Sequence, residues 1–237
     1  MNLKGFHGHN FFQPSLRCVR ITLAVSVLGV LAACSYQPGD KDNPITRAFS
    51  WFSYLNGDDL RAYCRGGGPD RYRIVYNATW HEQVRTYDIT ADFSGADLVV
   101  QVRGTPDFTK AIPLDDLLKP WRGVTLRDRI TTKDLNGVRS RLAMSDFYIP
   151  PANGTRVRSD HFFWVVMACE KGKFRFNAWE HPSKAFAKVT LIPALKPIDR
   201  TGIAFNAPHG LKERHENDKD QEDHYELVVR DGKFGVF

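Results

Sequence analysis

The chain has 237 residues and carries 33 basic against 27 acidic side chains, a formal net charge of +6. Lys4, Arg17 and Arg20 precede the first acidic residue, Asp40, so the remainder has 30 basic and 27 acidic side chains and a net charge of +3. This near balance argues against nucleic-acid binding, and the length fits one substantial domain.

Residues 21–33 form an apolar run without charge or proline, and they follow the three basic residues. A run of about thirteen residues is shorter than the roughly 20 that a membrane-spanning helix needs, but it fits the apolar core of a signal peptide. An ordinary cleaved signal and a buried helix are the alternative interpretations.

The run ends in Leu31, Ala32, Ala33 and Cys34. This sequence resembles the bacterial lipobox, in which a leucine and two small residues precede the cysteine that becomes the mature N-terminus. The resemblance implies that residues 1–33 are a cleaved lipoprotein signal peptide and that Cys34 carries acyl chains such as palmitate, which anchor the protein to a membrane. Ser35 stands where aspartate would signal inner-membrane retention, so the resemblance implies the outer membrane, facing the periplasm, over the inner membrane.

Residues 34–43 are mostly polar and contain Pro38 and Gly39, which predicts a flexible lipidated tether. The nine residues after Cys34 reach at most about 30 Å when extended. Residues 44–237 are therefore predicted to form a single periplasm-facing, β-rich domain close to its membrane.

Cys64 and Cys169 are the two cysteines left after Cys18, in the signal peptide, and Cys34. In an oxidising compartment two such thiols predict one disulfide. A nucleophilic cysteine or a metal ligand is the alternative.

The first half of the domain is predicted to change from helix to strand. Apolar residues at helical spacing predict a helix over 44–55, and a second helix over 58–64 precedes a glycine-rich turn. Residues 71–80 then alternate between apolar and polar, which predicts a strand with one buried and one solvent-facing side. Strands over 84–89 and 98–102 would complete an antiparallel meander.

The middle of the chain is less regular. Residues 106–120 are predicted to be irregular, with at most a short helix over 114–119, and a helix is predicted over 131–145. Arginines and lysines are frequent between 127 and 158. They could face an anionic lipid or envelope polymer, but the interspersed acidic residues favour an ordinary solvated surface.

Residues 161–180 give the clearest prediction, a β-hairpin that turns at Lys171 and Gly172. This register places Trp164 opposite Trp179 and Glu170 opposite Lys173, where an ion pair could form. The same register places six residues on a single apolar face of the hairpin: Val165, Met167, Cys169, Phe174, Phe176 and Ala178. Because Cys169 then points into the core, a structural disulfide is favoured over a reactive thiol.

Towards the C-terminus, strands are predicted over 187–192 and 202–205, followed by a highly charged excursion over 207–224. Asp231 and Gly232 predict a closing hairpin. The complete pattern indicates an α+β fold, with short N-terminal helices packed on a mainly antiparallel sheet that forms a sandwich or a partial barrel.

No catalytic motif was recognised. His81 and Glu82 lack the second histidine of a zinc protease motif because Arg85 occupies its position. His209, His215 and His224 are candidate metal ligands, but their spacing fits no compact ligand set, so neither a metal nor a cofactor is predicted.

Two short runs, residues 159–161 and 180–181, contain acids next to histidines. Neighbouring strand residues point to opposite faces, so neither run forms a catalytic group by itself. The sequence favours a lipid-anchored envelope protein that binds or scaffolds another envelope component without catalysis. A periplasmic hydrolase or metal-dependent enzyme and a carrier of a small apolar ligand are the alternatives.

Overall fold

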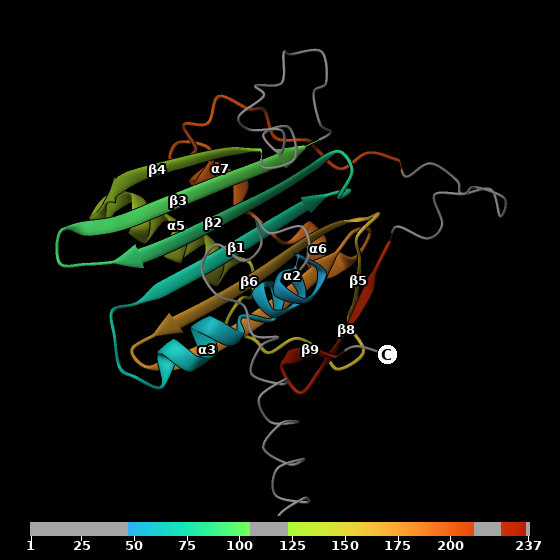
Figure 1. The fold of residues 1–237 in the computed structure, drawn as a ribbon, viewed down its shortest axis with the longest axis horizontal. Helices are drawn as coiled ribbons and strands as arrows, with labels where there is room; N and C mark the ends of the chain where they lie inside the picture. Colours follow the sequence, from blue (N-terminus) through green and yellow to red (C-terminus); the bar gives the residue numbers. More distant parts are fainter. Residues whose placement is uncertain (1–46, 105–122, 211–223, 236–237) are drawn as a thin grey trace, which may run out of the picture.

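The computed structural model describes residues 47–104, 123–210 and 224–235 (Figure 1). Cys34 and the rest of the predicted signal peptide and tether therefore lie outside the described residues, as does the short helix predicted over 114–119. No helix in the described part of the chain combines the length and the apolar character that crossing a membrane requires.

A six-stranded antiparallel sheet forms the centre of the domain, with the strand order β4-β3-β2-β1-β6-β7. Its strands are β1 (Arg71–Ala78), β2 (Gln83–Ala91), β3 (Gly95–Gly104), β4 (Val124–Thr131), β6 (Phe162–Glu170) and β7 (Lys173–Glu180). The predicted meander is confirmed, because β1 pairs with β2 and β2 with β3. In the described residues β4 and β7 are the open edges of this sheet.

A smaller three-stranded sheet has the order β5-β8-β9. It consists of β5 (Arg156–Arg158), β8 (Glu226–Arg230) and β9 (Lys233–Gly235). The predicted turn between β8 and β9 is confirmed: Arg230 pairs with Lys233, and Asp231 and Gly232 have φ values of 50° and 70°. Positive φ at both central residues is what a type I′ turn requires.

Short helices flank the large sheet. They are α2 (Arg47–Asn56), α3 (Asp58–Cys64), α5 (Thr132–Met144), α6 (Lys184–Ala187) and α7 (Ile192–Leu195). The helix predicted over 131–145 is confirmed, and it begins with a capping box in which Thr131 and Asp134 satisfy each other's backbone amides. In Figure 1, α2 and α3 lie in front of the sheet and α5 lies behind it.

Both faces of the large sheet are buried. One face of the sheet packs its aromatic and aliphatic side chains against α5 and α7. The other face packs against α2, α3 and the small sheet. The prediction of a solvent-facing side for residues 71–80 was therefore wrong, since Arg73 and Asn77 are 2% and 0% exposed. Trp80, the last residue of the predicted strand, lies beyond the end of β1 at Ala78 and packs on the face opposite to Tyr72.

The β6–β7 hairpin has the predicted register. Trp164 lies opposite Trp179, and Glu170 lies opposite Lys173. The contacts of the Glu170 carboxylate are with other residues, however: it accepts a hydrogen bond from Tyr148 at 3.0 Å and lies 4.0 Å from Arg175 Nε. The cross-strand ion pair with Lys173 is thus replaced by contacts with neighbouring elements.

The structure contains the predicted disulfide between Cys64 and Cys169. Cys64 ends α3, and Cys169 lies near the end of β6 with 0% exposure. The bond therefore ties the N-terminal helices to the end of β6 in the large sheet.

Several predicted elements were wrong. Residues 187–192 and 202–205, expected as strands, lie in α6, α7 and irregular segments, while β4 and β5 were not predicted. A mainly antiparallel fold with short helices is confirmed, but it is richer in strand than the α+β prediction. Both sheets are open, and neither closes into a barrel.

Candidate functional site

Of the three candidate metal ligands, His209 and His224 lie in the described part of the chain. His215 is outside the described residues. His209 Nε2 lies 3.0 Å from Glu82 Oε2, and its ring meets the edge of Phe162 at a centroid distance of 5.0 Å. The described residues, which include His224, contain no group of three or more histidine, cysteine, aspartate or glutamate side chains that could hold a metal ion.

Arg73 organises a first buried polar network, beneath the N-terminal helices. Its guanidinium donates two hydrogen bonds to Asp59, at 2.7 and 2.9 Å, and one to Asp88 at 2.7 Å. The Tyr54 hydroxyl donates to the other Asp88 oxygen at 2.7 Å. Burial, together with Asp88, raises the pKa of Tyr54 well above its usual value. The network therefore fixes α2 and α3 to strands β1 and β2.

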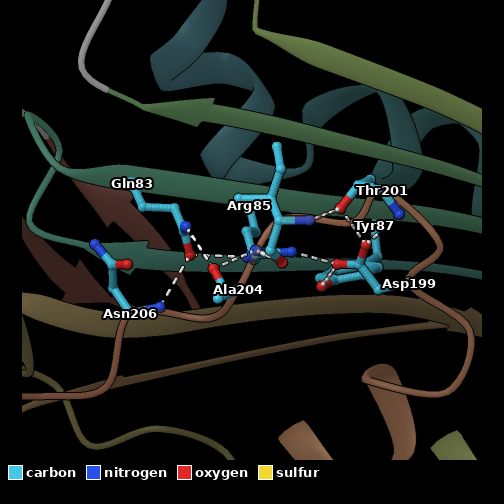
Figure 2. Close-up of polar contacts among 8 residues, drawn as sticks. Gln83, Arg85, Tyr87, Asp199, Thr201, Ala204 and Asn206 are labelled. Atoms are coloured by element: carbon cyan, nitrogen blue, oxygen red, sulfur yellow. Dashed lines mark hydrogen bonds and ion pairs between the residues drawn. The ribbon is translucent and has the colours of Figure 1, made fainter.

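Arg85 organises a second network on the opposite face of the sheet (Figure 2). Its guanidinium is fully buried, forms an ion pair with Asp199, and donates to the Ile203 and Ala204 carbonyls. Gln83 Oε1 accepts a hydrogen bond from Arg85 Nε at 2.8 Å. These side chains replace the ladder bonds that a strand over 202–205 would have made.

Asp199 has partners at both carboxylate oxygens. Oδ2 accepts from Arg85 and from the Tyr87 hydroxyl, and Oδ1 accepts from the backbone amide and hydroxyl of Thr201. Burial opposes ionisation, but the hydrogen bonds from Thr201 and Tyr87 hold the pKa of Asp199 below its usual value. With 2% of its side chain exposed, Asp199 is positioned to stabilise the fold and not to meet a substrate.

An open cleft of about 600 Å³ lies elsewhere, along the edge of β7. Its floor is formed by β7 residues 177–180, one wall by residues 182–188 with α6, and the other by residues 149–152 and the start of β5. The segment that leads from α5 to β5 crosses the edge of β7, and Asn177 fastens it by donating to the Asp146 and Ile149 carbonyls at 3.2 and 2.7 Å.

Backbone groups from two open sheet edges face this cleft. The amide of His181 donates to Phe162, so by antiparallel alternation the amide of Ala178 points away from β6. It donates to the side chain of Asn177 at 2.8 Å. The amide of Arg158, on the outer side of β5, donates to the Glu180 carboxylate at 2.9 Å. The cleft thus lies where the edges of the large and small sheets approach each other.

Glu180 is the titratable group with the most altered pKa in this cleft. Burial raises the pKa of its carboxyl to about 7, although the amide and guanidinium of Arg158 act in the opposite direction. His161 Nδ1 lies 3.0 Å from Glu180 Oε1. Residues 159–161 and 180–181 are two separate runs in the sequence. In the structure they meet in one contact, between His161 and Glu180, because the register of β6 and β7 brings them together.

The rim of the cleft is partly apolar. Ile149, which lines it, is 61% exposed. Pro150 and Pro151 follow in the same wall. Exposed apolar side chains beside a cleft are typical of surfaces that bind other proteins. No sequence pattern indicated this site. Its walls come from three separate segments, and these segments approach each other only in the folded protein.

Comparisons of the chain with models of protein families, with curated proteins and with solved structures found no match.

Proposed function

We propose that this chain is a lipid-anchored protein of the bacterial cell envelope that binds another envelope protein without catalysing a reaction. It would be attached through Cys34 to the outer membrane and face the periplasm. The cleft along β7 is the observation that carries the proposal, because it is open, has an apolar rim and adjoins two sheet edges.

The occupant that best fits the cleft is an extended segment of the partner. An extended peptide can add to an open sheet edge, with backbone hydrogen bonds supplying affinity and side-chain pockets supplying specificity. At the β7 edge the peptide would replace the Asn177 side chain as the acceptor for the Ala178 amide. Ile149 offers apolar surface, and Glu180 and Lys184 offer charged groups at the walls. The networks of Arg73 and Arg85 support the binding surface by fixing the sheet behind it.

The predicted lipid anchor in the sequence also supports the proposal. Leu31–Cys34 matches the lipobox pattern, and the nine-residue tether would keep the domain within about 30 Å of the lipid when fully extended. Two or three acyl chains hold a protein stably on a membrane, whereas one does so only marginally. A partner in the same membrane or in the adjacent periplasm would therefore be met at high local concentration.

Photo-crosslinking in intact cells tests this function. A photoreactive residue in place of Lys184, in the cleft wall, is expected to form an adduct with one envelope protein, through a single segment of it. The same residue in place of Phe93, which is fully exposed on the distant β2–β3 turn, is the matched control. The Cys34→Ala variant should lose most of the adduct because the domain is no longer held at the membrane. Identical adducts from both positions, or with and without Cys34, would contradict the proposal.

A further inference from the structure

A second cleft, of about 490 Å³, opens at the turn between β6 and β7. Three parts of the fold meet there: the start of β1, the middle of α5 and the first half of β7. The residues that line it are Asp70, Arg139, Tyr148, Glu170, Lys171, Lys173 and Arg175. Four basic side chains thus face two acidic ones, which leaves an excess of two positive charges.

Both acidic side chains already have partners in the walls. Asp70 accepts a hydrogen bond from the Lys171 amide at 2.8 Å and another from Arg139 at 2.8 Å. Glu170 accepts a hydrogen bond from the Tyr148 hydroxyl at 3.0 Å. The two carboxylates therefore fix the turn, α5 and the segment after α5 relative to each other.

The basic side chains are less completely used. Among the described residues Lys171 and Lys173 form no ion pair, and both are exposed. Arg175 lies over the Tyr148 ring at 5.1 Å, and 39% of its side chain is exposed. Its buried Nε atom lies 4.0 Å from the Glu170 carboxylate, too far for a hydrogen bond, and it has no hydrogen-bond partner in this part of the chain. A buried donor without a hydrogen bond is uncommon, and an oxygen of a bound anion would satisfy it.

The backbone fixes where these charges stand. Lys171 and Gly172 have φ values of 51° and 73°, as a type I′ turn requires, and Lys173 starts β7 directly opposite Glu170. Arg139 is held by the Tyr72 hydroxyl at 2.6 Å and by Asp70. The positive groups are therefore brought together before any ligand binds, which lowers the entropic cost of binding.

We propose that this cleft binds a phosphate group, carried either by a soluble phosphate ester or by the headgroup of an anionic phospholipid. Arginine forks and lysine ammonium groups are the side chains that proteins use for phosphate oxygens. The ligand would lie between Lys171, Lys173 and Arg175. This binding does not depend on a peptide in the β7 cleft or on the lipid at Cys34.

Two lysine substitutions separate this site from general electrostatic attraction. In the Lys171→Asn/Lys173→Ala variant, asparagine tolerates the left-handed backbone of residue 171, so the turn is kept. The Lys133→Asn/Lys196→Ala variant removes the same charge from two exposed lysines that do not line the cleft. Any difference in binding between the two variants is therefore due to the cleft.

The test uses the full chain in neutral detergent. Calorimetric titration with inorganic pyrophosphate is expected to give saturable binding that weakens roughly ten-fold or more in the Lys171→Asn/Lys173→Ala variant, since hydrogen bonds to charged groups are worth about 1.5–3 kcal/mol each. The control variant should bind as the wild type does. This outcome supports the soluble phosphate as ligand.

The lipid source is tested in micelles that contain phosphatidylglycerol or, as the neutral control, phosphatidylcholine. Slower amide hydrogen exchange at the β6–β7 turn with phosphatidylglycerol alone, lost in the Lys171→Asn/Lys173→Ala variant, supports the headgroup. Equal responses of both variants to both probes, or no response of the wild type to either, would overturn the proposal.

Discussion

Replacing Arg85 by methionine is expected to lower the free energy of unfolding by about 3–5 kcal/mol, because removing one partner of a buried ion pair leaves the other charge uncompensated. Asp199 would keep its Tyr87 and Thr201 hydrogen bonds but lose the guanidinium. The Ile203 carbonyl would lose its donor, while the Ala204 carbonyl would keep only the hydrogen bond from Gln83 Nε2. Urea unfolding followed by tryptophan fluorescence measures the change.

Arg129→Met is the matched control for this prediction. Arg129 pairs with Asp92 and Asp97 at 2.6 Å, but 53% of its side chain is exposed. Water screens exposed ion pairs, which therefore contribute little to stability, so this variant should change the free energy of unfolding little. The double variant Arg85→Met/Asp199→Asn should recover part of the loss, because it removes the orphaned charge. Equal losses in the two single variants would contradict the assigned role of Arg85.

Removing the disulfide is expected to cost about 2–5 kcal/mol of stability, since its loss frees a long loop in the unfolded chain. Cys64 and Cys169 are separated by 105 residues, and both are buried. The Cys64→Ala/Cys169→Ala variant avoids placing new hydroxyl groups in the core. Its unfolding midpoint in urea, compared with that of the wild type, measures the effect.

A reducing agent provides the control for the disulfide. The wild type should lose stability in the reductant until it approaches the double variant, whereas the double variant should be unaffected. The N-terminal helices are expected to detach first, because the bond ties α3 to β6. A wild type whose stability is the same with and without reductant would show that the bond does not form or does not contribute.

The elements that the sequence predicted well are those whose local signals agree. The β6–β7 hairpin has a turn sequence at Lys171 and Gly172 that matches its alternating faces. The helix at Thr132–Met144 has both a capping box and apolar residues at helical spacing. In such segments the local preference and the tertiary fold favour the same conformation.

Elements determined by tertiary contacts were missed. Strand β4 is mostly exposed, and Asp128 interrupts its apolar face of Val124, Leu126 and Ile130, so the local signal was weak without the pairing to β3. A strand was predicted over 187–192, but α7 starts at Ile192 and places Leu191 and Leu195 together in the core. Arg73 was expected to face solvent because its side chain is charged. In the structure it is buried, because Asp59 and Asp88 pair with its guanidinium.

Even less of the candidate site than of the fold could be predicted from the sequence. His161 and Glu180 lie at the open end of the hairpin, on its two strands, so their contact follows from the hairpin register. The Arg158 amide reaches Glu180 from the small sheet, and that approach depends on how the two sheets pack, which no local pattern encodes. The proposed lipidation signal is different, because such a signal is read by enzymes as a linear sequence and requires no fold.

The most direct test of a membrane-anchored function is the mass of the N-terminal peptide of the protein purified from bacterial membranes. The account predicts a peptide that begins at Cys34, with a diacylglycerol on its sulfur and an acyl chain on its amine, and that is absent from the Cys34→Ala variant. A peptide that begins at an unmodified Cys34, or at another residue, would contradict the account.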